Sequence, residues 1–168
     1  LYAAIKASSK AFWRDHTNHR QGRLDLRQAR RKVVRMAFAD LGLKDDEAAF
    51  ALVDDFTAEK DRAITPLPGA LETLRMLKAR GLPLALITNG ASDTQRRKIE
   101  RFGLARFFDA IFIEGEFGAG KPDERVFRAA LDALKVEASQ AWMVGDDLER
   151  DIAGAGKAGI RGIWVDWR

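Results

Sequence analysis

Apolar residues follow a helical rhythm over about the first 65 residues of the chain. They recur every three or four positions between polar residues, and this part contains no convincing strand pattern. The pattern predicts one helix over residues 3–19, a second from Asp25 to Gly42, and a third capped by Asp45 or Asp46. An aspartate can accept hydrogen bonds from the first N–H groups of a helix, and glycine suits the left-handed position after one. Residues 1–64 are therefore predicted to be all-helical.

The rhythm changes after a turn at residues 66–69, which holds two prolines and a glycine. Short apolar runs predict strands over residues 82–87, 110–113, 141–144 and 162–165. The intervening segments predict helices over residues 70–80, from a capping box of Ser92 and Gln95 to Gly103, after Asp123, and over residues 148–157. Strands that alternate with helices form a parallel sheet covered on both faces. The predicted fold class is α/β, with a doubly wound parallel sheet, and Trp142 and Trp164 are expected in its core.

Polar residues follow three of the predicted strands at the point where each strand ends. The segment 88–90 (Thr-Asn-Gly) follows the first strand, Lys121 follows the second, and Asp146 and Asp147 follow the third. Ligands of such sheets bind beyond the carboxyl ends of the strands. All of these polar groups are therefore expected on one edge of the sheet.

The residue types at this edge suit phosphate and a divalent cation. The hydroxyl and turn amides of residues 88–90 can hold phosphate oxygens, and Lys121 can neutralise their charge. Carboxylates at Asp146 and Asp147 offer the oxygen ligands that Mg²⁺ prefers. Each feature also has an ordinary interpretation: an Asn-Gly turn, a solvated lysine, and acids that favour a helix start.

Residues 115–122 are predicted to form a glycine-rich loop. Within it, the segment 115–121 imitates a nucleotide-binding phosphate loop, because it reads G-x-x-x-x-G-K after a predicted strand. The next residue is Pro122, where that loop has a serine or threonine for magnesium. Proline also removes an amide donor. The sequence therefore argues against a nucleoside triphosphatase.

Composition and charge narrow the classes of partner. The net charge is +4, and the basic residues over 27–35 alternate with apolar ones at helical spacing, which indicates a solvated helix face. We expect no nucleic-acid partner. No apolar run approaches the roughly 20 residues that span a membrane, so no membrane partner is expected either. The chain contains no cysteine, which excludes thiol chemistry and is compatible with the cytoplasmic location that we expect.

Three segments in this order resemble motifs of the haloacid dehalogenase-like hydrolase superfamily. Residues 86–90 (Leu-Ile-Thr-Asn-Gly) resemble its second motif, residues 120–123 (Gly-Lys-Pro-Asp) its third, and residues 145–151 (Gly-Asp-Asp-Leu-Glu-Arg-Asp) its fourth. The resemblance covers about residues 66–166. By position and helicity, residues 1–64 resemble the helical cap that the family inserts after its first motif, and residues 65–168 resemble its α/β core.

The resemblance implies a Mg²⁺-dependent phosphatase that forms an aspartyl-phosphate intermediate. It implies that the phosphoryl group is bound by Thr88, Asn89, Gly90 and Lys121. It also implies that Lys121, Asp146 and Asp151 are catalytic, with Asp146 bound to Mg²⁺ and Asp151 next to the metal or joined to it through water. Asp147 is expected either to assist the metal or to cap the helix. The substrate class implied is a small phosphorylated metabolite, such as a nucleoside monophosphate or a sugar phosphate.

One motif of the family has no counterpart in the chain. The first motif, an Asp-x-Asp after the first strand, supplies the nucleophile, and no such segment precedes the helical part. We therefore expect the chain to be an internal portion of a longer protein, with an incomplete core that lacks its central strand and is inactive alone. Two alternatives stay open: a metal-independent 2-haloacid dehalogenase and a catalytically inactive binding module.

Overall fold

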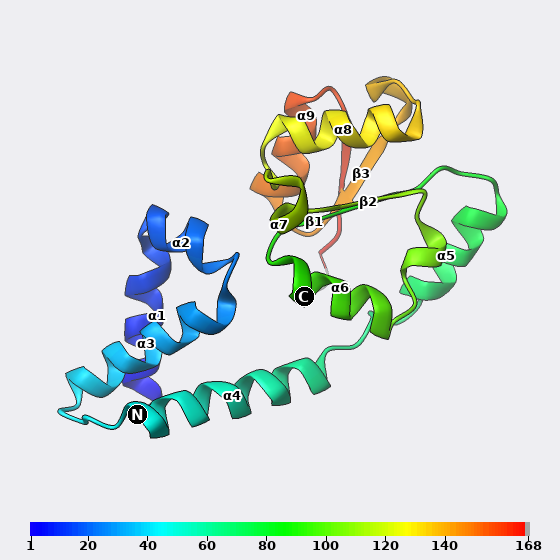
Figure 1. Cartoon of the computed structure of the whole chain (residues 1–168). Helices are drawn as coiled ribbons and strands as arrows, with labels where there is room; N and C mark the ends of the chain where they lie inside the picture. The colour runs from blue at the N-terminus through cyan, green and yellow to red at the C-terminus, as the bar shows by residue number, and fades with distance from the viewer. Residues whose placement is uncertain (167–168) are drawn as a thin grey trace. The chain divides into compact units, whose positions relative to one another are not determined.

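The computed structural model describes residues 1–166, so the last two residues of the predicted core lie outside it. The chain divides into two compact units at Thr65 and Pro66 (Figure 1). The first unit is entirely helical and the second carries all the described strands. Each unit is described by itself below.

The first unit is built from helices joined by short connections. They are α1 (Tyr2–Arg14), α2 (His16–Gly22), α3 (Leu26–Asp40) and α4 (Asp46–Ala63). The single helix predicted over residues 3–19 is wrong. The backbone is extended at Asp15, so α1 ends before this residue and a second helix, α2, begins after it. The Asp15 side chain accepts a hydrogen bond from the amide of Asn18 at 2.8 Å, which caps α2. The predicted caps at Asp25 and Asp45 are confirmed, since both accept backbone N–H bonds at the starts of α3 and α4.

Helix α3 is the centre of this unit. It packs against both α1 and α4. Its buried residues follow the three-and-four spacing of one apolar face: Ala29, Val33, Val34, Ala37 and Phe38. The face divides into two clusters, one with Phe12 of α1 and one with Ala49 and Val53 of α4.

The second unit alternates helices with parallel strands. Its helices are α5 (Ala70–Ala79), α6 (Ser92–Arg101), α7 (Glu114–Phe117), α8 (Glu124–Leu134) and α9 (Gly154–Lys157), with short helical turns η1 (Ala105–Phe107), η2 (Ala138–Gln140) and η3 (Leu148–Ala153). Its strands are β1 (Ala85–Thr88), β2 (Ala110–Ile113), β3 (Trp142–Gly145) and β4 (Arg161–Trp164). In Figure 1, α8 and α9 lie on one side of the strands and α5 and α6 on the other. The α/β class with helices on both faces is therefore confirmed.

The strands form two separate parallel pairs. β1 pairs with β2 from Ala85 opposite Ala110, and β3 pairs with β4 from Trp142 opposite Arg161. No pairing joins the two sheets among residues 1–166. They share one core nevertheless, because Val126 and Phe127 of α8 belong to a cluster that also receives side chains from three strands: Ile87, Phe112 and Met143.

Both tryptophans predicted in the core are exposed. Trp142 is 56% accessible and Trp164 is 43% accessible. The alternation of β3 sends Met143 toward α8 and turns Trp142 and Val144 to the opposite face, where Ile163 of β4 is also exposed. Within residues 1–166, the Trp142 ring is partnered by the guanidinium of Arg161, 4.8 Å from the ring centroid.

Two local predictions also need correction. The capping box of Ser92 and Gln95 is wrong, since α6 starts after Ala91 without a side-chain cap. Both side chains reach elsewhere: Ser92 donates to Glu116, and Gln95 donates to the carbonyl of Asn89. The segment 115–122 is not wholly a loop, because its first residues belong to the short helix α7.

None of the helices within residues 1–166 is both long and apolar enough to cross a bilayer.

The position of Phe127 predicts a large effect on stability. Its ring is fully buried in the cluster that joins the two sheets. We expect Phe127→Ala to lower the free energy of unfolding of the second unit by about 3–5 kcal/mol, because the truncation leaves a cavity. Urea denaturation followed by circular dichroism measures the change. Leu82→Ala, at an exposed position, is the control and is expected to shift stability by less than about 0.5 kcal/mol. Equal midpoints for the two variants would contradict this account of the core.

Candidate active site

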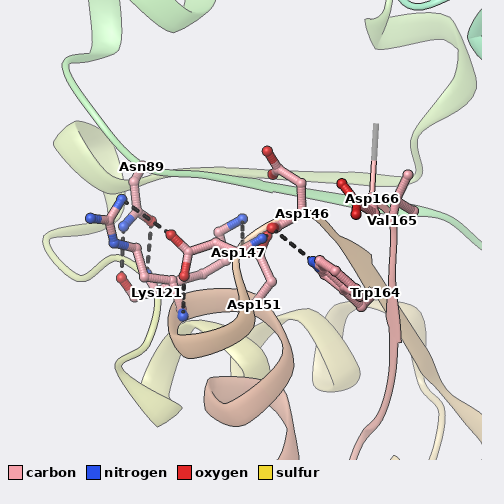
Figure 2. A pocket seen from close by; sticks show the side chains of 9 residues that line it. Asn89, Lys121, Asp146, Asp147, Asp151, Trp164, Val165 and Asp166 are labelled. Atoms are coloured by element: carbon pink, nitrogen blue, oxygen red, sulfur yellow. Dashed lines mark hydrogen bonds and ion pairs between the residues drawn. The ribbon is translucent and has the colours of Figure 1, made fainter. Parts of the chain in front are cut away.

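A cavity of about 410 Å³ opens at the carboxyl ends of the strands in the second unit (Figure 2). Its lining residues come from the segments that follow all four strands: Asn89, Lys121, Asp146, Asp147, Arg150, Asp151, Trp164, Val165 and Asp166. Five predicted site residues therefore meet at one edge, as the strand-end rule requires. Thr88 and Gly90 flank Asn89 but are not among the described residues that line the cavity.

The ion pair between Lys121 and Asp151 lies at the floor of this cavity. The Lys121 Nζ lies 2.6 Å from the Asp151 Oδ1, and the side chains are only 14% and 5% accessible. The second carboxylate oxygen of Asp151 accepts a hydrogen bond from the Asp147 amide at 3.2 Å. Removing one partner of such a buried pair leaves an uncompensated charge, so each side chain depends on the other for its position.

Gly145, the last residue of β3, makes room for Asp151. A Cβ atom on Gly145 would lie 2.2 Å from Asp151 Oδ2 and 2.5 Å from Asp151 Cβ. Any larger residue there must therefore displace the carboxylate. The glycine that precedes the acidic turn is required by this close approach of a side chain to the strand end.

Asp147 caps the turn that follows the strand. Its Oδ1 accepts hydrogen bonds from the amides of Glu149 at 3.1 Å and Arg150 at 2.8 Å. Its other oxygen lies 3.6 Å from the guanidinium of Arg150. Of the two roles that the sequence leaves open for Asp147, the described contacts support the helix cap.

Asp146 occupies a different position from the other two acids. Its carboxylate points away from the helical turn that carries Asp147 and Asp151 (Figure 2). Its main-chain carbonyl accepts a hydrogen bond from the indole N–H of Trp164 at 3.1 Å. Trp164 therefore connects the end of β4 to the acidic turn after β3, a role that its predicted core position did not suggest.

The donor set around the cavity is suited to a hard cation. Four carboxylates line it, against the two cationic side chains of Lys121 and Arg150. Among residues 1–166, no three acids or histidines are grouped so as to hold a metal by themselves. Mg²⁺ fits such a site, because it binds through one or two carboxylates and keeps several waters.

Asn89 connects the loop after β1 to the loop that carries Lys121. Its Nδ2 donates to the Lys121 carbonyl at 2.7 Å, and its Oδ1 accepts from the Lys121 amide at 2.8 Å. The Gly90 amide donates to the Oε2 of Glu114 at 3.0 Å, so this predicted phosphate donor already has a partner. The contribution of Glu114 was missed from the sequence, although an acid directly after an apolar strand was a visible signal.

A second ion-pair network joins α6 and α7 beside the site. Arg96 donates two hydrogen bonds to the carboxylate of Glu116, at 2.8 and 2.6 Å, and Ser92 donates a third at 2.6 Å. The hydrogen bonds from Arg96, and then that from Ser92, lower the pKa of Glu116 from 4.5 to about 2. The network holds the helix after β1 against the helix after β2.

This network predicts a dependence of stability on pH. Because the pKa of Glu116 is lower in the folded protein, its contribution is fully present above about pH 4.5 and is lost as the pH falls toward 2. We expect Glu116→Gln to be less stable than the wild type at pH 7, with a difference that shrinks below pH 4.5 and in high salt. Thermal unfolding between pH 2 and 7 measures this. A difference that stays constant over the whole range would contradict it.

Comparison with known proteins places this site in a family. The profile of the haloacid dehalogenase-like hydrolases matches residues 3–165. The chain is 45% identical over 138 residues to a phosphoserine phosphatase of Thermus thermophilus, covering 82% of the chain but 54% of that protein. It is 32% identical over 162 residues to the pyrimidine 5'-nucleotidase YjjG of Escherichia coli, covering 96% of the chain and 68% of that protein.

A solved structure agrees with the sequence comparison. The 2-haloacid dehalogenase of Pseudomonas syringae superposes with a TM-score of 0.65 at 31% identity, over 98% of this chain and 68% of that one. The chain spans about half the length of the Thermus relative. With a family match over nearly its whole length and the motifs gathered around one cavity, the chain belongs to the haloacid dehalogenase-like hydrolase family.

Proposed function

We propose that the chain is the cap and most of the core of a Mg²⁺-dependent phosphatase that acts on a small phosphorylated metabolite, such as a nucleoside monophosphate or a sugar phosphate. The observation that carries the proposal is the buried Lys121–Asp151 ion pair at the floor of a cavity that Asp146 also lines. Relatives named as phosphatases of phosphoserine and of pyrimidine nucleotides support the reaction class.

The residues of this chain supply positioning and charge, which are the main requirements of phosphoryl transfer. Lys121 presents a compact ammonium that neutralises an incoming phosphate and orients the attacking carboxylate. The Thr88 hydroxyl and the main-chain N–H of Asn89, at the end of β1, bind phosphate oxygens. The Gly90 amide takes part only if it leaves the carboxylate of Glu114. Asp151 keeps Lys121 in place through the ion pair.

The charge around the cavity is the reason for including Mg²⁺ in the proposal. A phosphate dianion that enters a cavity with four carboxylates and two cationic side chains is repelled unless a further cation is bound. When bound, Mg²⁺ supplies that neutralisation, and Asp146 is the residue proposed to hold it. Asp147 maintains the turn that presents Asp146, and Asp151 acts next to the metal or through water.

The nucleophile is proposed to lie on a segment upstream of residue 1, on a strand that ends in Asp-x-Asp. The arrangement of the strands supports this placement. β1 and β3 each have one paired neighbour within the described residues, and both pack against the cluster centred on α8. A strand between them would pair with both and bring its carboxyl end to the cavity.

Two alternatives make different predictions. A metal-independent 2-haloacid dehalogenase is supported by the likeness to the Pseudomonas syringae structure. That reaction needs no metal, however, so it does not require a metal-binding carboxylate at Asp146. A catalytically inactive binding module would keep the cavity without an upstream nucleophile. The residues immediately before Leu1 in the gene product separate this module from either enzyme, because only an enzyme needs the Asp-x-Asp strand.

We expect the intact gene product to release phosphate from small phosphomonoesters with Mg²⁺ and not after chelation. Lys121→Ala and Asp146→Asn should each lower the rate by about 100-fold or more, because each removes a group that stabilises the developing charge. Asp132→Asn, at an exposed position on α8, is the control and should leave the rate unchanged. A phosphate-release assay measures these rates. Metal-independent chloride release from 2-chloropropionate, without phosphatase activity, would instead establish the dehalogenase.

The 168-residue chain alone should release no phosphate from the same substrates, because it carries no proposed nucleophile. The measurement is the same assay on the chain purified by itself, with circular dichroism to establish that it is folded. Phosphate release at the rate of the intact protein would contradict the placement of the nucleophile upstream.

A further inference from the structure

Three segments that are distant in the sequence meet at two residues that line the cavity, Asn89 and Lys121. They are Asn89–Gly90 after β1, Glu114–Gly115 after β2, and Gly120–Lys121 before α8. The amide of Gly115 donates to the carbonyl of Gly90 at 3.0 Å. A Cβ atom on Gly120 would lie 2.6 Å from the Glu114 Cδ and 2.8 Å from the Asn89 Oδ1. The close approach of these segments leaves no room for a side chain at position 120.

The carboxamide of Asn89 pairs with Lys121 as one backbone segment pairs with another. It donates to the Lys121 carbonyl and accepts from the Lys121 amide, at 2.7 and 2.8 Å. The main-chain carbonyl of Asn89 accepts from the side-chain amide of Gln95, on α6, at 3.0 Å, so the residue is held through its backbone as well. In Figure 2 the Asn89 side chain lies against the Lys121 segment. The side chain is therefore oriented toward the protein at the edge of the cavity.

Glu114 holds the adjoining residue in place. Its carboxylate is buried, with the residue only 6% accessible, and its Oε2 accepts from the Gly90 amide at 3.0 Å. Gly90 has a φ of 118°, a conformation that glycine adopts readily and other residues avoid. A buried carboxylate is stable only where donors satisfy it, so Glu114 fixes the path of the loop after β1.

The position of the Lys121 ammonium depends on this arrangement. Lysine carries its charge on a flexible four-carbon stem, which by itself defines no position. Lys121 lies outside the described helices and strands, so no helix or strand ladder fixes its backbone. The two hydrogen bonds between Asn89 and the Lys121 backbone fix the near end of the side chain, and Asp151 fixes the far end.

We propose that Asn89 is a positioning residue that acts through the backbone of Lys121, with Glu114 holding Gly90 so that Asn89 is correctly placed. The carboxamide of Asn89 sets where the Lys121 ammonium meets the phosphoryl group, and it does not itself bind the substrate. The catalytic consequence rests on the proposed phosphatase function, whereas the structural arrangement does not. The Asn-Gly pair is thus a link between two loops as well as a turn.

Hydrogen exchange on the 168-residue chain tests the link without any enzymatic activity. We expect the Lys121 amide to exchange about tenfold faster in Asn89→Ala, because its acceptor is lost. Asn89→Asp should have a similar effect, since its second oxygen faces the Lys121 carbonyl in place of a donor. Gln140→Glu makes the same amide-to-acid change in η2, which precedes β3 at the opposite edge of the sheet, and should leave Lys121 unaffected.

Amine acylation followed by mass spectrometry gives a second readout. Lys121 should become several-fold more reactive in the Asn89 variants, while Lys135 and Lys157 keep their wild-type reactivity. A rise at all lysines in Asn89→Ala reports general unfolding. In that case Asn89→Asp, which has nearly the same shape as the wild-type side chain, replaces it in both measurements. Unchanged exchange and reactivity at Lys121 in folded Asn89 variants would overturn the proposal.

Kinetics of the intact gene product separate this proposal from the proposed function. If Asn89 acts through Lys121, Asn89→Ala should lower kcat by about tenfold or more alone but by less than about twofold in a Lys121→Ala background, since contacting groups are not additive. An equal loss in both backgrounds would show that the Asn89 side chain contacts the substrate independently and would overturn the role assigned here. If the protein releases no phosphate in any form while exchange at Lys121 responds as expected, the phosphatase proposal alone fails.

Discussion

The buried ion pair of Lys121 and Asp151 is the interaction on which the site depends. It joins the loop after β2 to the turn after β3, and these two strands belong to different sheets. Neither charge is stable at that depth without the other. The glycine at position 145 and the carboxamide of Asn89 both serve this pair, one by making room for Asp151 and the other by holding the backbone of Lys121.

The helix α8 makes the ion pair possible, because it holds both sheets against one core. Phe127 and Val126 receive side chains from β1, β2 and β3 on the same helix face. The strand ends are therefore fixed relative to one another although no backbone pairing joins the two sheets within residues 1–166. A site that needs groups from several strand ends gains this rigidity from packing.

The sequence predicted the gathering of the site because it depends on a rule of topology. Polar residues after successive parallel strands must meet, and Lys121, Asp146 and Asp151 do so. It did not predict the exposure of Trp142 and Trp164, since burial depends on which elements cover a sheet face. The break at Asp15 was hidden by a continuous apolar rhythm, and the roles of Asn89 and Glu114 arise from contacts between distant segments.

A crystal structure of the intact gene product with Mg²⁺ and inorganic phosphate tests the central claim most directly. The account predicts one phosphate oxygen about 3 Å from the Lys121 Nζ and another at that distance from the Thr88 hydroxyl. It also predicts the metal on the carboxylate of Asp146. Phosphate bound elsewhere, or a Lys121 ammonium turned away from the cavity with its ion pair to Asp151 broken, would contradict it.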